Sequence, residues 1–163
     1  MDDYFVQSFA DRGWFDTFQI NGNPRAVPWF GSSTIAALTS LVMARRRISK
    51  EGFGTALHWA LAQSRGKTRS ADPIIAFRRA EALVPHVKGD LDCLPRATAL
   101  FVYLRTVGHD PTFIIGVKQY PFFAHSWIEL DGAPVLEADD GPTKLSRFTP
   151  ILGSTPINSC LIA

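Results

Sequence analysis

Three residues in the second half of the chain have the types and the order of a nucleophilic triad. They are Cys93, His125 and Glu137. In such a triad the thiolate attacks, the imidazole takes up and returns the proton, and the carboxylate fixes the imidazole tautomer and stabilises its charged form. Order along the chain does not by itself bring side chains together. The prediction therefore depends on the elements that carry these residues.

The segment 92–104 predicts a buried helix with the cysteine in its first turn. Asp92 is a good N-cap, Pro95 is tolerated where backbone N–H groups lack intrahelical partners, and Gly108 ends the run. Apolar side chains cover most of the expected helix surface, which is typical of a core helix. A thiol at this position lies near unpaired N–H donors and the positive end of the helix dipole. Both favour the thiolate over the thiol.

After Gly108 the pattern changes to that of strands, which we expect at 112–118, 125–130 and 133–138. The turn between the last two strands decides where Glu137 points. If it holds only Asp131 and Gly132, Glu137 faces away from His125. If the loop has three residues, with Gly132 in the left-handed conformation of a bulge, His125 lies opposite Glu137 on one face. Both arrangements are open at this point, and Asp139 is the alternative acid.

The first half of the chain predicts helices at 33–47, 51–64 and 73–84. Residues 1–32 are expected to form an irregular N-terminal arm, and 140–163 to be loop and tail. The fold class is therefore α+β, with an antiparallel sheet packed on the Cys93 helix and one domain over 33–163. The side chains expected to be buried include Ile35, Leu38, Leu41 and Val42 on the first helix and Leu83 on the third.

The composition argues against several classes of function. A net charge of +2 over 163 residues is too small to predict nucleic-acid binding. Two cysteines, Cys93 and Cys160, do not make a disulfide framework. The start of the chain lacks a signal-peptide pattern, and the longest apolar window, around 35–44, is shorter than the roughly 20 residues of a membrane helix. We expect a soluble cytoplasmic protein with no nucleic-acid or membrane partner.

Several short motifs together resemble the lasso-peptide maturation proteases, the leader peptidases often called B proteins. These motifs are Cys-Leu-Pro-Arg at 93–96, Ile-Gly-Val at 115–117, Phe-Phe-Ala-His-Ser-Trp-Ile-Glu at 122–129, and the Asp-Gly turn followed by Glu137. The resemblance implies a transglutaminase-like, papain-related fold. It implies that Cys93 is the nucleophile and His125 the base. The third position is usually aspartate in that family, and Glu137 occupies it here.

The resemblance also implies a substrate and two partners. The substrate is a ribosomally made precursor peptide, from which the leader is removed. Longer family members carry an N-terminal leader-binding domain, whereas residues 1–32 are too short for one, so a separate leader-recognition protein is expected. A lasso cyclase is expected to act next. None of the chemical steps needs a metal, nucleotide or other cofactor.

Four further residues are candidates for substrate contact. The loop before the His125 strand carries Tyr120, Phe122 and Phe123, which we expect at the rim of the cleft, with core packing as the alternative. Arg96 either recognises the peptide or pairs with a nearby carboxylate such as Asp90 or Asp92. Two other functions remain open: acyl transfer to an amine, as in a transglutaminase, and a non-catalytic interaction module with Cys93 as a small buried side chain.

Overall fold

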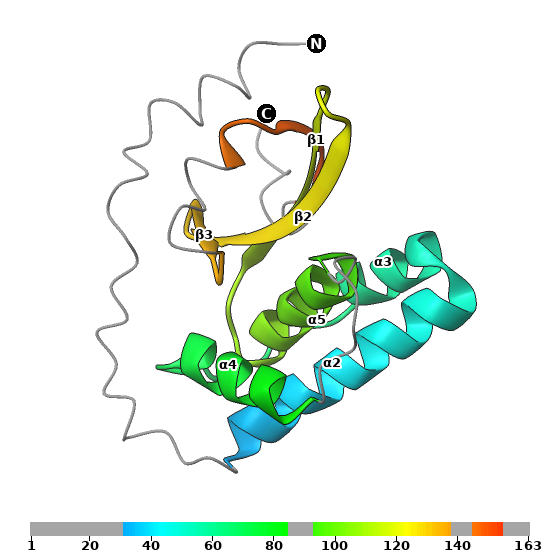
Figure 1. The fold of residues 1–163 in the computed structure, drawn as a ribbon. Helices are drawn as coiled ribbons and strands as arrows, with labels where there is room; N and C mark the ends of the chain where they lie inside the picture. Colours follow the sequence, from blue (N-terminus) through cyan, green and yellow to red (C-terminus); the bar gives the residue numbers. More distant parts are fainter. Residues whose placement is uncertain (1–30, 85–92, 138–144, 155–163) are drawn as a thin grey trace, which may run out of the picture.

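The computed structural model describes residues 31–84, 93–137 and 145–154. In these parts of the chain, helices come first and an antiparallel sheet follows. Figure 1 shows two layers, with the helices gathered on one side of a strongly bent sheet. The predicted α+β class is confirmed. The N-terminal arm expected at 1–32 lies almost entirely outside the described residues.

The helical layer contains α2 (Ser32–Glu51), α3 (Phe53–Leu61), α4 (Pro73–Leu83) and α5 (Cys93–Thr106). α2 is longer than predicted, because it continues past Arg47 to Glu51 and ends only at Gly52. The Arg47 guanidinium lies 2.9 Å from the Glu51 carboxylate one turn later, a spacing that stabilises the helix. The predicted second helix is correspondingly shorter. None of the helices in the described parts of the chain is long and apolar enough to cross a membrane.

The buried face of α2 differs from the predicted one. Leu38 and Leu41 are partly buried and pack against the core as predicted, whereas Ile35 and Val42 are each 55% exposed. The fully buried positions are the small residues Thr34, Ala37, Ser40 and Ala44. Small side chains let α2 lie close to both α4 and α5, which it contacts along much of its length. Ser33, in the first turn of α2, makes no capping hydrogen bond. Its hydroxyl lies 2.6 Å from the Tyr103 hydroxyl of α5.

α4 begins as predicted, with Pro73 at its first position after Asp72, although the Asp72 side chain makes no capping hydrogen bond. Its buried side includes Ile74, Phe77 and Ala80. The prediction that Leu83 is buried is wrong, since this last residue of α4 is 39% exposed.

The described sheet has four strands in the order β3-β2-β1-β4. The strands are β1 (Pro111–Lys118), β2 (Phe123–Leu130), β3 (Ala133–Val135) and β4 (Thr149–Ser154). The prediction that 140–163 is only loop and tail is wrong, since β4 pairs with β1. β4 lacks a strand pattern in the sequence because it contains a proline and a glycine. Its pairing with β1 is also irregular, with a shift in register between Ile115 and Gly116.

α5 is the central element of the core. It contacts α2, α3 and α4 on one side and β1 and β2 on the other. Eight consecutive residues, Ala97 to Leu104, are buried, in agreement with the predicted core helix. The helix that carries Cys93 is therefore held rigidly against the strand that carries His125.

Candidate active site

Cys93 is the first residue of α5 and is partly exposed. Its position at a helix start agrees with the prediction, and Asp92, the expected cap, lies outside the described residues. A thiol here is accessible to a substrate, while residues 97–104 of the same helix are buried. Unpaired N–H groups in the first turn favour negative charge at this point.

His125 lies on β2 and forms an ion pair with Glu137. The imidazole Nε2 is 3.0 Å from Glu137 Oε2, and the two side chains are 22% and 16% exposed. Because Nε2 faces the carboxylate, Nδ1 is the ring nitrogen left for the thiol. A carboxylate in this place holds the proton on Nε2, which leaves Nδ1 free to accept one.

The turn before β3 is the two-residue form. Leu130 pairs with Ala133, and Asp131 and Gly132 both have positive φ, at 54° and 82°. The alternative three-residue loop is therefore wrong, and a continued strand would turn Glu137 away from His125. Pairing instead stops at Val135.

Leu136 is the residue that brings Glu137 back to His125. Its φ is 62°, in the left-handed region, so the alternation of faces is broken at this point. The Leu136 side chain is partly buried against the main core, and Glu137 reaches the histidine. For a residue with a Cβ this conformation costs about 1–3 kcal/mol and persists only where neighbouring contacts impose it.

The pKa values of Cys93 and His125 move in opposite directions. A hydrogen bond to His125 lowers the pKa of Cys93 to about 7, against an opposing contribution from burial. Hydrogen bonds to Cys93 and then to Glu137 raise the pKa of His125 to about 9. Between these two values the stable form is a thiolate beside an imidazolium. This pair is the activated form of a nucleophilic cysteine.

Ser126 is a further residue at the site. Its side chain is buried, and its hydroxyl has no hydrogen-bond partner within the described parts of the chain. Both its hydroxyl and its backbone lie close enough to Cys93 to lower the pKa of the thiol. Sequence reasoning passed over this residue, although it directly follows the candidate base.

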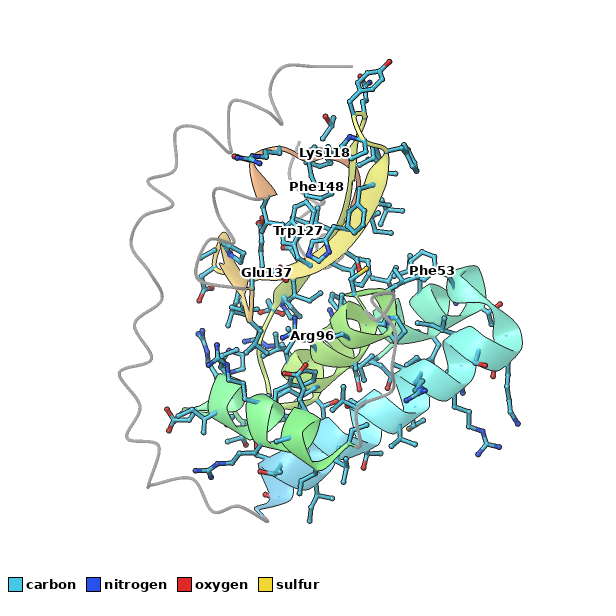
Figure 2. The ribbon with its side chains drawn as sticks, viewed as in Figure 1. Phe53, Arg96, Lys118, Trp127, Glu137 and Phe148 are labelled. Atoms are coloured by element: carbon cyan, nitrogen blue, oxygen red, sulfur yellow. The ribbon has the colours of Figure 1, made fainter. Side chains whose placement is uncertain are left out.

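Aromatic rings surround the imidazole. Trp127 is stacked with His125 at 6.1 Å between ring centroids, and Phe148 lies 5.8 Å away. Gly116, which pairs with His125 on the neighbouring strand, leaves room for the Trp127 ring and for the Cβ of Phe148, since a Cβ at position 116 would lie 2.9 Å from each. Figure 2 shows Trp127 and Phe148 together against the sheet, with Glu137 nearby. Phe148 belongs to the segment predicted to be loop.

The loop before β2 is exposed, as is Phe123, the first residue of β2. Tyr120 is 87% exposed, Phe122 74% and Phe123 54%. Core packing is therefore wrong for Tyr120 and Phe122. Phe123 lies in edge contact with Phe148, at 6.2 Å, and so connects the loop to the rings around His125.

Arg96 pairs with Glu81 of α4, at 2.5 Å. The expected partners Asp90 and Asp92 lie outside the described residues, as do Asp139 and Cys160. Within the described parts of the chain, no three His, Cys, Asp or Glu side chains are grouped so that they could hold a metal ion.

Comparisons with known proteins agree with this geometry. The family model of the transglutaminase-like superfamily matches residues 35–153, which include Cys93, His125 and Glu137. A stretch of 60 residues is 38% identical to the microcin J25-processing protein McjB of Escherichia coli. That stretch is 37% of this chain and 29% of the length of McjB. No solved structure matches. The resemblance seen in the short motifs is confirmed, and the chain belongs to the transglutaminase-like superfamily.

Proposed function

We propose that this protein is a cysteine peptidase that removes the leader from a ribosomally made lasso-peptide precursor. The observation that carries the proposal is the position of His125, between a thiol whose pKa is lowered and a carboxylate 3.0 Å from its Nε2. The similarity to McjB, whose name describes a protein that processes microcin J25, supports the substrate class. Because ribosomes would make the precursor, we place the reaction in the cytoplasm.

The chemistry proceeds in two displacement steps. The Cys93 thiolate attacks the scissile carbonyl, and backbone N–H groups at the start of α5 stabilise the oxyanion. The His125 imidazolium then protonates the departing amine, so that the core peptide leaves with a new N-terminus and the leader stays as a thioester. A water molecule, deprotonated by neutral His125, attacks the thioester and releases the leader as a carboxylic acid.

Glu137 has a supporting part in this scheme. Its carboxylate holds the imidazole tautomer and stabilises the imidazolium, and it exchanges no proton with the substrate. The longer glutamate side chain fits because Leu136 turns the backbone at this point. Its removal should therefore slow the reaction less than removal of Cys93 or His125.

The exposed aromatic side chains of the β1–β2 loop and of the first residue of β2 are the proposed substrate contacts. Tyr120, Phe122 and Phe123 are all at least half exposed. Phe123 contacts Phe148, and Phe148 in turn contacts His125. Exposed aromatic side chains in the segment just before His125 are suited to apolar leader residues beside the scissile bond. The peptidase domain of the proposal is 33–163.

The proposal includes two protein partners, taken from the family resemblance. A separate leader-recognition protein would present the precursor and raise its effective concentration at the site. A lasso cyclase would consume the released core peptide. Cleavage should accordingly be faster with the recognition protein than without it, and equal rates would count against that partner.

Cleavage of a candidate precursor, followed by mass, tests the function. With the recognition protein present, wild type should yield the leader and the core, and Cys93→Ala and His125→Ala should each abolish cleavage while keeping the wild-type melting temperature. Glu137→Ala should retain part of the rate. Full turnover in Cys93→Ala would refute the peptidase mechanism. A leader joined to an added amine, with little hydrolysis, would indicate acyl transfer instead.

The pH dependence gives a second test. The active form needs Cys93 deprotonated and His125 protonated, so activity should rise through about pH 7 and fall through about pH 9. Glu137→Gln should move the falling limb to lower pH, because the carboxylate raises the pKa of His125. A profile that shows one limb only, unchanged in Glu137→Gln, would contradict the ion-pair form.

A further inference from the structure

Arg96 lies one helical turn after Cys93 on α5 and connects three parts of the fold. Its Nε donates to Glu81 Oε1 at 2.5 Å, and its Nη2 lies 3.5 Å from Glu81 Oε2. The same Nη2 donates to the backbone carbonyl of Leu136 at 2.9 Å. One guanidinium therefore joins the nucleophile's helix, α4 and the residue that follows β3. Figure 2 shows Arg96 between the helical layer and the part of the chain that carries Glu137.

The carbonyl that Arg96 holds belongs to the peptide unit leading into Glu137. Leu136 has a φ of 62°, which a leucine adopts only where other contacts impose it. Its side chain, packed against the core, is one such contact, and the bond from Arg96 to its carbonyl is another. Without the second contact, the peptide is free to turn toward the extended form, in which Glu137 faces away from His125.

We propose that Arg96 is a positioning residue that acts through Leu136 to hold Glu137 against His125. Glu81 fixes the guanidinium by a two-point pair of the kind that arginine forms with carboxylates. The first turn of α5 thus supplies the nucleophile and also fixes the acid at the far end of the triad. This inference rests on the proposed function, because it assigns Glu137 to the same reactive pair.

The geometry favours positioning over recognition of substrate. The charge of Arg96 is already matched by Glu81, and the two side chains are only 35% and 27% exposed. A second arginine makes a comparable bridge elsewhere. Arg65 Nε donates to the carbonyl of Gly108 at 2.9 Å, and its Nη1 lies 2.6 Å from Asp110. That bridge is at the other end of α5, so Arg65→Gln removes a similar set of contacts far from the triad.

The reactivity of the Cys93 thiol, measured without any peptide, tests the proposal. In a Cys160→Ala background, the rate of alkylation by iodoacetamide is measured from pH 5 to pH 10. If Arg96 acts through Glu137, Arg96→Gln and Glu137→Gln should both make the His125 imidazolium less stable and so raise the pKa of Cys93. The rise of the alkylation rate with pH should then occur at higher pH in both variants. A shift of one unit from about 7 lowers the thiolate fraction at pH 7 roughly fivefold. Arg65→Gln should leave the curve unchanged.

The double variant separates positioning from general structure. Arg96→Gln added to Glu137→Gln should produce no further shift, since the contact that Arg96 supports is already gone. A further shift in the double variant, or a wild-type curve in Arg96→Gln, would overturn the proposal. If Arg96→Gln does not fold, Glu81→Gln takes its place, with a smaller shift expected in the same direction.

The same curves distinguish this proposal from the proposed function. If alkylation responds to Arg96 and Glu137 as described but no precursor is cleaved, the positioning role stands and the peptidase assignment fails. If cleavage depends on Cys93 and His125 but Arg96→Gln has the same alkylation curve as wild type, only the positioning role fails.

Discussion

The substitution Gly116→Ala should damage the site from the neighbouring strand. Gly116 pairs with His125, and a Cβ at this position would lie 2.9 Å from Cη2 and Cζ3 of Trp127 and from Cβ of Phe148. Ordinary contacts begin near 3.4 Å, so these neighbours must move by about half an ångström. One of the atoms in the way is close to the backbone and cannot swing aside.

Two effects of Gly116→Ala can be given a magnitude. Adding a methyl group to a packed interior costs about 1–3 kcal/mol, which lowers the melting temperature of a domain of this size by roughly 2–12 °C. Trp127 and Phe148 are also the rings that contact His125. A displaced base reduces turnover steeply, so we expect a loss on the order of tenfold in precursor cleavage.

Calorimetry and the cleavage assay together test this prediction. Gly54→Ala is the matched control, because a Cβ there meets nothing within 4 Å and alanine is the better helix former in α3. It should leave activity unchanged and raise stability by up to about 1 kcal/mol. If Gly116→Ala kept both the melting temperature and the turnover of wild type, the close packing of Trp127 and Phe148 around His125 would be wrong.

Three further predictions concern single side chains. Ser126→Ala should raise the pKa of Cys93, seen as a shift of the alkylation curve to higher pH. It should not lower stability, since the buried hydroxyl has no hydrogen-bond partner in the described parts of the chain; an unshifted curve would exclude an effect of Ser126 on the thiol. Burial lowers the pKa of His109 in the folded protein, where its Nδ1 accepts a hydrogen bond from Arg69. The neutral histidine therefore stabilises the fold above pH 6.5, and this contribution is lost as the pH falls through the lowered pKa of the folded state. The decrease in melting temperature below pH 6.5 should therefore be smaller in His109→Gln than in wild type, and an equal decrease would contradict this. Tyr120→Ala should weaken cleavage and change stability by less than about 0.5 kcal/mol, because the side chain is 87% exposed; unchanged cleavage would remove it from the substrate site.

Local signals in the sequence were enough to predict the central parts of the fold. The helix of Cys93 has an apolar surface nearly all round, a proline in the first turn and a glycine just beyond its end, and each feature has a local physical cause. The strands around His125 have the β-branched and apolar residues of a buried sheet. These two elements are also the ones that carry the candidate nucleophile and base.

The remaining features depend on contacts between distant parts of the chain. The buried face of α2 consists of small residues such as Ala37 and Ala44, because two helices approach it closely, and nothing in the pattern of α2 itself indicates this. β4 is a strand because β1 offers it an edge to pair with.

The approach of Glu137 to His125 was the hardest feature to predict. From the alternation of side chains along a strand, Glu137 can face His125 only if there is a bulge at Gly132. The chain instead makes a two-residue turn there, and the alternation is broken four residues later, at Leu136. Leucine has no preference for that conformation, so no local signal marks it. The contact found at this position is a hydrogen bond from Arg96, forty residues earlier in the chain, to the Leu136 carbonyl.

The most direct test of the central claim is the intact mass of the protein during turnover. Precursor and recognition protein are mixed with the enzyme, the reaction is stopped in acid within milliseconds to seconds, and the mass is read before and after digestion. A Cys93 nucleophile predicts a transient species heavier by the leader less one water, with the added mass on the peptide that contains Cys93, and no such species in Cys93→Ala. Steady release of leader and core without any adduct, and at the same rate in Cys93→Ala, would contradict it.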